Sequence, residues 1–286
     1  MATYETLLVE TKGRVGLITL NRPDKLNAWS WTLEREFLAA LAQLNADPTV
    51  NVMVVTGAGR AFCAGGDISG FNEVLAGGRN GPKGPTPLTA EDGSPEVPIA
   101  LGRGKPIIAA INGHAVGIGL TMPLACDIRI ASDKAKLSVR FVKVGLTPEC
   151  GSTRYLSLVA GMGNALYMAL TGRIVEADEA LQRGLVDQVV PHDQLMDVAM
   201  ALANEIASNP PSAVWAAKRV IHENAGETDM RRVVTREGFA IRAARGDPDH
   251  AEAVRAFLEK REPNFGGGKG AASSGKGAAS SAPTGA

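Results

Sequence analysis

The sequence has no net charge, few cysteines and no long apolar run, and each absence excludes a class of protein. The 286 residues include 30 basic and 30 acidic side chains, whereas a nucleic-acid groove or a polybasic membrane patch needs a positive excess. Cys63, Cys126 and Cys150 are far apart, which fits neither a disulfide framework nor a CxxC metal site. No charge-free apolar run reaches the roughly 18 residues of a membrane span.

Neither end of the chain carries a recognisable targeting signal. The first residues, MATYETLLVE, contain no basic n-region and no apolar h-region, which a secretory signal requires. The last residues, 284–286, do not form a peroxisomal signal of the SKL type. We therefore expect a cytoplasmic protein that binds neither nucleic acid nor membranes.

Common cofactor and catalytic motifs are also missing. The turns at 57–62 (GAGRAF) and 117–122 (GIGLTM) have Phe62 and Met122 where a dinucleotide-binding GxGxxG has its third glycine. The sequence contains no P-loop, no GxSxG elbow and no HExxH, and its four histidines have no ligand spacing. We predict neither a nucleotide cofactor nor a metal site.

Short apolar strands alternate with helical patterns along most of the chain. Strands are predicted at 7–11, 15–20, 51–56, 105–111, 127–131 and 185–190. Helices are predicted after a cap at Ser30 or Thr32, and at 119–125, 153–171, 176–183, 192–208, 210–224, 228–245 and 248–261. Strands of buried type between helices are typical of a parallel or mixed α/β sheet. We place this α/β core at 1–195 and a helical C-terminal region at 196–265.

Two segments have the composition of loops or linkers. Residues 76–98 are rich in glycine and proline, and a long insert of this kind in a compact domain is usually a lid or a mobile loop. From 266 to 286 only Gly, Lys, Ala, Ser, Pro and Thr occur, and GKGAASS is repeated. Because these side chains offer almost no apolar area to bury, we expect 266–286 to be a disordered tail.

Two glycine-rich turns are the first candidates for chemistry. The segments RAFCAGGDIS (60–69) and INGHAVGIGLT (111–121) each follow a buried strand and lead into a helix-like run. Glycine lets the backbone approach a ligand closely, and helix N-termini leave N–H groups unpaired. Two such donors that converge on one point would stabilise an oxyanion. The alternative is that both segments are ordinary strand-to-helix turns.

The two turns belong to a longer series of motifs that spans residues 4–265. The series consists of LNRPDKLNA (20–28), RAFCAGGDI (60–68), KPIIAAINGHAVGIGL (105–120), ACDIRIAS (125–132), FVKVGLTPECGST (141–153), ALTGRIVEADEALQRGLVDQVVP (169–191) and FLEKREPNF (257–265). In this order the motifs resemble the enoyl-CoA hydratase/isomerase family, also called the crotonase family. The resemblance implies the crotonase fold, with a repeated ββα core and a helical C-terminal region that forms homotrimers, which often pair into hexamers.

The resemblance also assigns residues to the substrate. It implies that the thioester oxygen of an acyl-CoA lies between the backbone N–H groups of Gly66 and Ile118, where the family more often has glycine than Ile118. Coenzyme A enters as part of the substrate, and no separate cofactor is implied. The residues expected along its pantetheine and adenine are Lys25, Ala28, Ala64, Gly66, Asp67 and Ile68.

Two C-terminal residues match positions that reach the CoA of a neighbouring subunit in this family. These are Phe257 and Lys260. The alternative for Phe257 is helix packing with Val254 and Leu258, and for Lys260 it is a solvated charge.

The acid/base positions distinguish the reactions of the family. Hydratases of the family use two glutamates, and the matching positions here hold Thr121 and Phe141, neither of which can act as a carboxylate base. Glu149 in GLTPECGST matches the acid/base position of one group of enoyl-CoA isomerases, and of an aspartate in aromatic-ring isomerases and a dehalogenase. Apolar neighbours should raise the pKa of its carboxyl towards useful proton-transfer values. The alternative is an exposed loop glutamate before a helix.

We therefore predict an enoyl-CoA double-bond isomerase of the Δ3,Δ2 type with Glu149 as acid and base. The alternatives are an enoyl-CoA hydratase of fatty-acid β-oxidation, a ring isomerase of an aromatic pathway, and a non-catalytic acyl-CoA-binding trimer. Two other carboxylates, Asp67 and Asp127, are expected to cap a helix and to bind backbone donors, and not to take part in chemistry.

Overall fold

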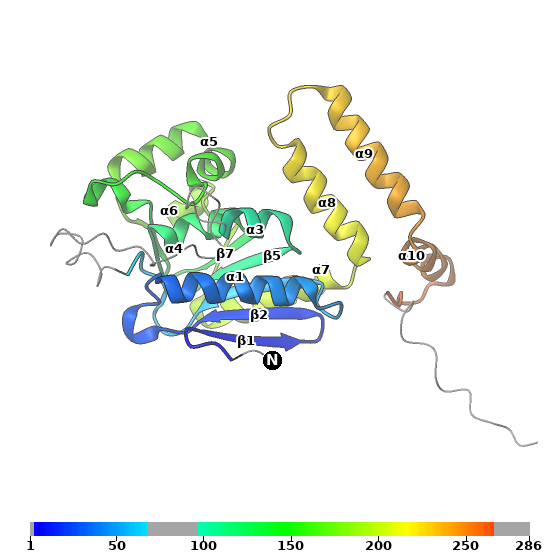
Figure 1. The fold of residues 1–286 in the computed structure, drawn as a ribbon, viewed down its shortest axis with the longest axis horizontal. Coiled ribbons are helices and arrows are strands. Elements are labelled where there is room, and N and C mark those ends of the chain that lie inside the picture. Colours follow the sequence, from blue (N-terminus) through cyan, green and yellow to red (C-terminus); the bar gives the residue numbers. More distant parts are fainter. Residues whose placement is uncertain (1–2, 68–96, 266–286) are drawn as a thin grey trace, which may run out of the picture.

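The computed structural model describes residues 3–67 and 97–265. The predictions for Ile68, for most of the 76–98 insert and for the 266–286 tail lie outside these residues. Within them the chain forms a mixed α/β core and a group of C-terminal helices that extend from it (Figure 1).

The larger sheet contains the strands that the sequence predicted. Its order is β1 (Leu7–Lys12), β2 (Val15–Leu20), β3 (Val52–Gly57), β5 (Ile107–Ile111), β7 (Ile128–Ser132) and β10 (Gln188–Val190). Only β1 is antiparallel to its neighbour. The central strands β3 and β5 are buried along their whole length, which is typical of parallel strands covered on both faces. The predicted α/β fold class is therefore confirmed.

A smaller sheet was not predicted. It contains β4 (Ala61–Cys63), β6 (His114–Val116), β8 (Lys136–Ser138) and β9 (Val175–Glu176). Strands of two or three residues are too short to show a hydrophobic alternation. Successive strands go one to each sheet and are followed by a helix, as in β5, β6 and α4 (Ile118–Thr121), and again in β7, β8 and α5 (Ser152–Thr171). This pattern is the repeated ββα unit.

Helices cover the larger sheet on both faces. On one face α1 (Trp31–Ala46) begins at Ser30, whose Oγ accepts the Leu33 N–H at 3.2 Å, so Ser30 is the cap. Helix α1 packs on this face of the sheet together with α3 (Val97–Arg103). On the other face α7 (Leu195–Ala207) buries Ala199 and Ala203 against the strands. By its packing α7 belongs to the core, and the helices outside it begin with α8.

Three helices extend beyond the core: α8 (Pro211–Asn224), α9 (Met230–Arg245) and α10 (Pro248–Glu259) (Figure 1). The buried Lys218 Nζ attaches α8 to the core through the carbonyl oxygens of Leu101 (2.6 Å) and Lys105 (3.1 Å) and through Asp127 Oδ2 (2.8 Å). No residue of α9 is buried.

The shorter elements are α6 (Ala177–Gln182) and the 3₁₀ turns η1 (Pro23–Lys25), η3 (Pro123–Ala125), η4 (Arg140–Val144) and η5 (His192–Gln194). In the described part of the chain every helix is too short or too polar to span a bilayer.

Candidate active site

The two glycine-rich turns meet at one edge of the smaller sheet. Strands β4 and β6 are parallel neighbours, so the turns that follow them lie at the same edge. A Cβ atom on Gly117, which has φ +56°, would lie 3.9 Å from the Gly65 Cα. The turns are therefore in contact, as the oxyanion-hole interpretation requires.

Each turn offers a backbone donor. In the parallel bridge between Trp29 and Gly66, the groups of the 60–69 turn that bond to Trp29 are the Gly65 carbonyl and the Asp67 N–H. The Gly66 N–H is left outside the bridge. Ile118 is the first residue of α4, where an N–H has no partner within its own helix. Neither the Gly66 nor the Ile118 N–H has an acceptor among residues 3–67 and 97–265. Such a pair of free donors can stabilise a developing oxyanion.

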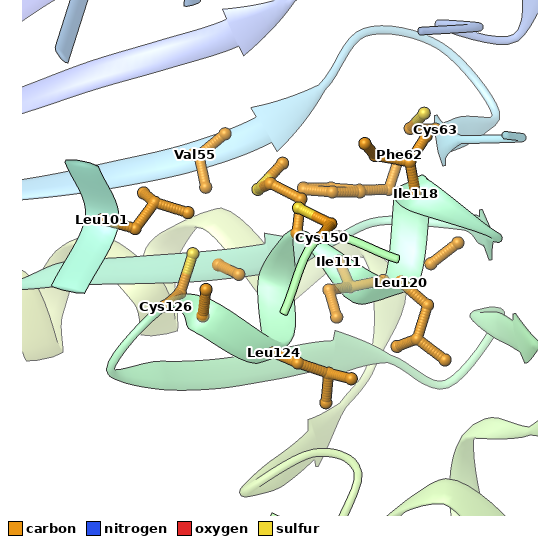
Figure 2. Close-up of a cluster of buried hydrophobic side chains, with 14 of the residues drawn as sticks. Val55, Phe62, Cys63, Leu101, Ile111, Ile118, Leu120, Leu124, Cys126 and Cys150 are labelled. Atoms are coloured by element: carbon orange, nitrogen blue, oxygen red, sulfur yellow. The ribbon is translucent and has the colours of Figure 1, made fainter. Parts of the chain in front are cut away.

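Close packing fixes the separation of the turns. A Cβ atom on Gly119 would overlap the carbonyl oxygen of Cys63, so α4 can approach β4 only with glycine at this position. The Phe141 ring, which is buried, has its Cζ 3.9 Å from the Cβ position of Gly117. Figure 2 shows Ile118 within the same apolar cluster as Phe62 and Cys150. The floor beneath the two donors is therefore apolar.

The two segments predicted to bind CoA lie side by side. The Ala64 N–H donates to the Leu26 carbonyl at 3.0 Å, and the Trp29 N–H donates to the Gly65 carbonyl at 2.8 Å. These bonds bring together Lys25, Ala28, Ala64, Gly66 and Asp67. Lys25 is exposed at the end of η1, so its ammonium group is available to a phosphate.

The Asp67 carboxylate forms an ion pair with Arg22. The helix that Asp67 was expected to cap lies outside the described residues. Asp67 Oδ2 accepts from Arg22 Nη2 at 2.9 Å, and the Asp67 N–H donates to the Trp29 carbonyl at 2.9 Å. The ion pair connects the 22–28 loop to the turn that carries Gly66.

Phe257 lies on α10 and Lys260 follows it directly. Figure 1 shows α10 at the far end of the molecule from α4, the helix that begins with Ile118. Phe257 is 82% exposed, and Val254 and Leu258 are exposed as well. The helix-packing alternative for Phe257 is therefore wrong within one chain. Within residues 3–67 and 97–265, no hydrogen bond joins either residue to the turn that carries Gly66.

Glu149 precedes α5 in a sharp turn. Cys150 (φ 56°) and Gly151 (φ 67°) follow it, both in left-handed conformation, and the Ser152 N–H donates to the Glu149 carbonyl at 3.1 Å. Glu149 is exposed in the single chain, as the alternative of a loop glutamate before a helix expects. Its partial desolvation still raises the pKa of its carboxyl, which is the predicted direction. Val144 and Leu146, however, are exposed, so they do not supply the burial that the sequence analysis attributed to them.

The remaining candidates are structural. Thr121 and Phe141 are buried and bring no carboxylate to the site. Asp127 accepts the Ile107 N–H at 2.8 Å and pairs with Lys218 and with His222 (3.1 Å), so it binds a backbone donor as predicted.

Burial raises the pKa of the Cys63 and Cys126 thiols to about 12, so these thiols remain protonated at neutral pH.

Sequence reasoning missed one carboxylate, that of Glu34. It lies in the first turn of α1, where the Trp29 Nε1–H donates to its Oε2 at 3.3 Å. Burial raises the pKa of Glu34, the Trp29 hydrogen bond lowers it, and the charge of Glu149 raises it again. Glu34 and Glu149 are thus close enough to interact electrostatically. The sequence carries no signal that relates these two carboxyls, because they are far apart along the chain.

Comparison with known proteins identifies the family. Residues 10–268 match the model of the enoyl-CoA hydratase/isomerase family. The chain is 36% identical to a protein of Mycobacterium bovis named probable enoyl-CoA hydratase, over 92% of this chain and 98% of the relative. It is also 36% identical to the 1,2-epoxyphenylacetyl-CoA isomerase of Escherichia coli, over 92% and 99% of the two chains.

The fold leads to the same family. The crystal structure of an enoyl-CoA hydratase from Bacillus anthracis superposes with a TM-score of 0.82 at 33% identity, covering 92% of this chain and all of the other. The chain belongs to the enoyl-CoA hydratase/isomerase family and has the crotonase fold. It is therefore an enzyme of acyl-CoA metabolism, and the non-catalytic alternative is not retained.

Proposed function

We propose that the enzyme moves the double bond of a 3-enoyl-CoA to position 2, with Glu149 as both base and acid. The carboxylate of Glu149 takes a proton from the α-carbon, and the electron pair of that C–H bond forms an enolate. The enolate oxygen accepts hydrogen bonds from the Gly66 and Ile118 N–H groups. As the carbonyl re-forms, the double bond moves between the α- and β-carbons, and the γ-carbon takes the proton back from Glu149.

The observation that carries this proposal is the lack of a carboxylate at the two hydratase positions, Thr121 and Phe141, while Glu149 directly precedes Cys150, which belongs to the same buried apolar cluster as Ile118. Partial desolvation raises the pKa of the Glu149 carboxyl, and a base is most effective when its pKa approaches the working pH. Thr121 and Phe141 are buried and cannot activate water. A site without the two hydratase carboxylates favours proton transfer over addition of water.

An enoyl-CoA hydratase is the second candidate. The Mycobacterium bovis relative is named a probable enoyl-CoA hydratase, and Glu149 alone could activate a water molecule. The name of the Escherichia coli relative, 1,2-epoxyphenylacetyl-CoA isomerase, also supports a ring-modifying reaction as a third candidate. We infer the CoA contacts at Lys25, Ala28, Ala64, Asp67 and Ile68 from the family pattern, with no cofactor besides the CoA of the substrate.

The exposed apolar side chains of α9 and α10 support assembly into a homotrimer or a hexamer. Phe239 and Ile241 on α9, and Phe257 and Leu258 on α10, are all exposed in the single chain. In such an assembly Phe257 and Lys260 would reach the CoA of a neighbouring subunit. The cytoplasmic location remains a prediction.

The test is to compare Glu149→Gln with the wild type on trans-3-hexenoyl-CoA and on crotonyl-CoA. Glutamine keeps the size of the side chain but cannot take a proton, so we expect kcat for isomerisation to fall by roughly 10²–10⁴. The matched control is Glu205→Gln, because Glu205 is an exposed glutamate of α7. Wild-type hydration of crotonyl-CoA that exceeds isomerisation would favour the hydratase. Near-normal turnover of Glu149→Gln would show that the base is another residue.

A further inference from the structure

The direction of the Gly66 N–H is fixed by the carbonyl group of the residue before it. The Gly65 carbonyl and the Gly66 N–H belong to one peptide unit, which is planar and trans, so the two groups point in opposite directions. The Trp29 N–H donates to the Gly65 carbonyl oxygen at 2.8 Å. As long as this hydrogen bond holds, the Gly66 N–H points away from the Trp29 N–H.

A second hydrogen bond holds the other side of Gly66. The Asp67 N–H donates to the Trp29 carbonyl oxygen at 2.9 Å. Gly66 therefore lies between two backbone hydrogen bonds to the same residue, Trp29. Its N–H can change direction only if the turn and the segment that carries Trp29 move relative to each other.

One guanidinium group joins this segment to the turn. Arg22 Nη2 donates to Asp67 Oδ2 at 2.9 Å, and Arg22 Nη1 donates to the Ala28 carbonyl oxygen. Ala28 is the residue before Trp29, and Asp67 is the residue after Gly66. Because the guanidinium presents its donors in a rigid fork, it holds its two partners at a fixed separation. The two charged side chains are only 21% and 20% exposed, so salt screens this pair less than a surface pair.

Arg22 is itself anchored to the core. Its backbone N–H donates to Asn27 Oδ1 at 2.8 Å, and its carbonyl oxygen accepts the Asn27 N–H at 2.9 Å. The Asn27 side chain is fully buried, and its Nδ2 donates to the carbonyl oxygens of Ala58 (2.9 Å) and Ala61 (2.8 Å). Ala61 begins β4, the strand that leads to the Gly66 turn. The backbone of Arg22 is therefore fixed relative to the strand whose turn its side chain holds.

We propose that Arg22 is a positioning residue, which holds the Gly66 N–H in the direction of the thioester oxygen through its ion pair with Asp67. The inference rests on the oxyanion role proposed for Gly66. Arg22 acts through Asp67 and the Ala28 carbonyl, and not on the reacting atoms. It also pairs the Asp67 carboxylate, which would otherwise place an unpaired negative charge one residue away from the donor and oppose the charge of the enolate.

The test observes the thioester group directly, with 2,4-hexadienoyl-CoA as the probe. Hydrogen bonds to the thioester oxygen draw electron density towards it, which shifts the near-ultraviolet absorption of the conjugated chain to longer wavelength. The probe is bound at saturation to Glu149→Gln, which we expect to consume it slowly, and to Glu149→Gln combined with Arg22→Met. We expect a red shift with the first protein and a clearly smaller red shift with the second.

Kinetics with trans-3-hexenoyl-CoA give a second readout. Loss of an oxyanion donor costs about 10²–10³ in kcat, so we expect a misdirected donor in Arg22→Met to lower kcat by roughly 10–10². The values of kcat and kcat/KM should fall together, as they do when an interaction made only in the transition state is lost. Asp67→Ala should act in the same direction. Because both variants remove one ion pair, the double variant should lose less than the product of the two single losses.

Arg183→Met is the matched control. Arg183 Nη2 pairs with Glu179 Oε1 at 2.8 Å, and these side chains are 23% and 28% exposed. The control pair is therefore nearly equal to the Arg22–Asp67 pair in length and burial, but it lies at the end of α6. Arg183→Met should leave both the red shift and kcat unchanged.

Each result has a defined meaning. A red shift that is the same with and without Arg22 overturns the proposal. A rise in KM at constant kcat overturns it too, because the pair would then only shape the loop that meets CoA, and so do losses that multiply in the double variant. If Arg22→Met does not fold, the red shift of Asp67→Ala, measured in the same Glu149→Gln protein, decides.

Failures of the proposed function give different results. Absence of a red shift from Glu149→Gln itself would overturn the oxyanion assignment, and this inference with it. If Glu149 is not the base, the turnover of Glu149→Gln shows it, and the dependence of the red shift on Arg22 still supports the inference.

Discussion

Glu149 owes its position to the two left-handed residues that follow it. A left-handed conformation costs a residue other than glycine roughly 1–2 kcal/mol, and Cys150 adopts it with a buried side chain. The turn reverses the chain between η4 and α5 and presents the carboxyl of Glu149 before the helix begins. Strain of this kind persists where the surrounding packing holds it, and it is common at functional sites.

Gly151 provides a test of this turn. A Cβ atom at Gly151 would lie 3.3 Å from the Tyr155 ring and 3.5 Å from Pro98 Cβ. We expect Gly151→Ala to lower the free energy of unfolding by about 2 kcal/mol and to lower kcat, because Glu149 must shift with the turn. Gly145→Ala is the control, since Gly145 is also left-handed (φ +71°) but no described atom lies within 4 Å of its Cβ position. Equal losses of kcat in both variants, measured beside urea unfolding, would contradict this explanation.

At the scale of the elements, the buried Lys218 is a main polar connection between α8 and the core, beside the Trp215 Nε1–H that donates to the Asn51 carbonyl at 3.1 Å. Lys218 Nζ bonds two carbonyl oxygens and Asp127, so it bridges α8, α3 and the start of β7. Asp127 also accepts from the Ile107 N–H and pairs with His222. Removing the lysine would leave two buried carbonyls and part of a carboxylate without a partner.

We therefore expect Lys218→Met to cost about 3 kcal/mol of stability, within the range for breaking a buried ion pair. Chemical denaturation measures the change, and Lys134→Met is the control, because Lys134 is exposed. Methionine keeps most of the aliphatic length, so loss of packing does not explain the difference. A change below about 1 kcal/mol, the value of a surface pair, would show that α8 is held by its apolar contacts instead.

The strands and the site residues also show how much of the structure can be predicted from the sequence alone. The strands of the larger sheet were predicted to within three residues at each end because their buried runs are bounded by turn residues. The smaller sheet was not predicted, although the turns that carry Gly66 and Ile118 follow two of its strands. The glycine pattern located Gly66 and Ile118, whose turns the structure brings into contact, but the surroundings of Glu149 depend on packing between distant segments, which no local pattern encodes.

At the scale of the whole molecule, one chain leaves much apolar surface exposed. On α5, Leu158, Met162, Leu166 and Leu170 are exposed, and on α10 so are Phe257 and Leu258. Contiguous apolar surface of this kind usually marks an interface.

Light scattering should therefore give the mass of three or six chains for the wild type. Phe257→Ser combined with Leu258→Ser should shift the mass towards that of one chain, and it should lower the affinity for acyl-CoA because no phenylalanine ring would then reach the CoA of a neighbouring subunit. Leu8→Ser is the control, since Leu8 is an exposed apolar residue on the edge strand β1. A wild-type mass of one chain would contradict the prediction, and so would a double variant that remains fully assembled.

The contact between Gly119 and the Cys63 carbonyl has a consequence for how this scaffold can change its reaction. Activation of the thioester is assigned to two backbone N–H groups, and their spacing is fixed by glycine packing, so it does not depend on the side chains around them. The proposed base, Glu149, comes from another segment, the turn before α5. Selection can therefore exchange acids and bases one at a time while the oxyanion site is inherited unchanged. A new reaction of the same enolate then needs a substitution, not a new fold.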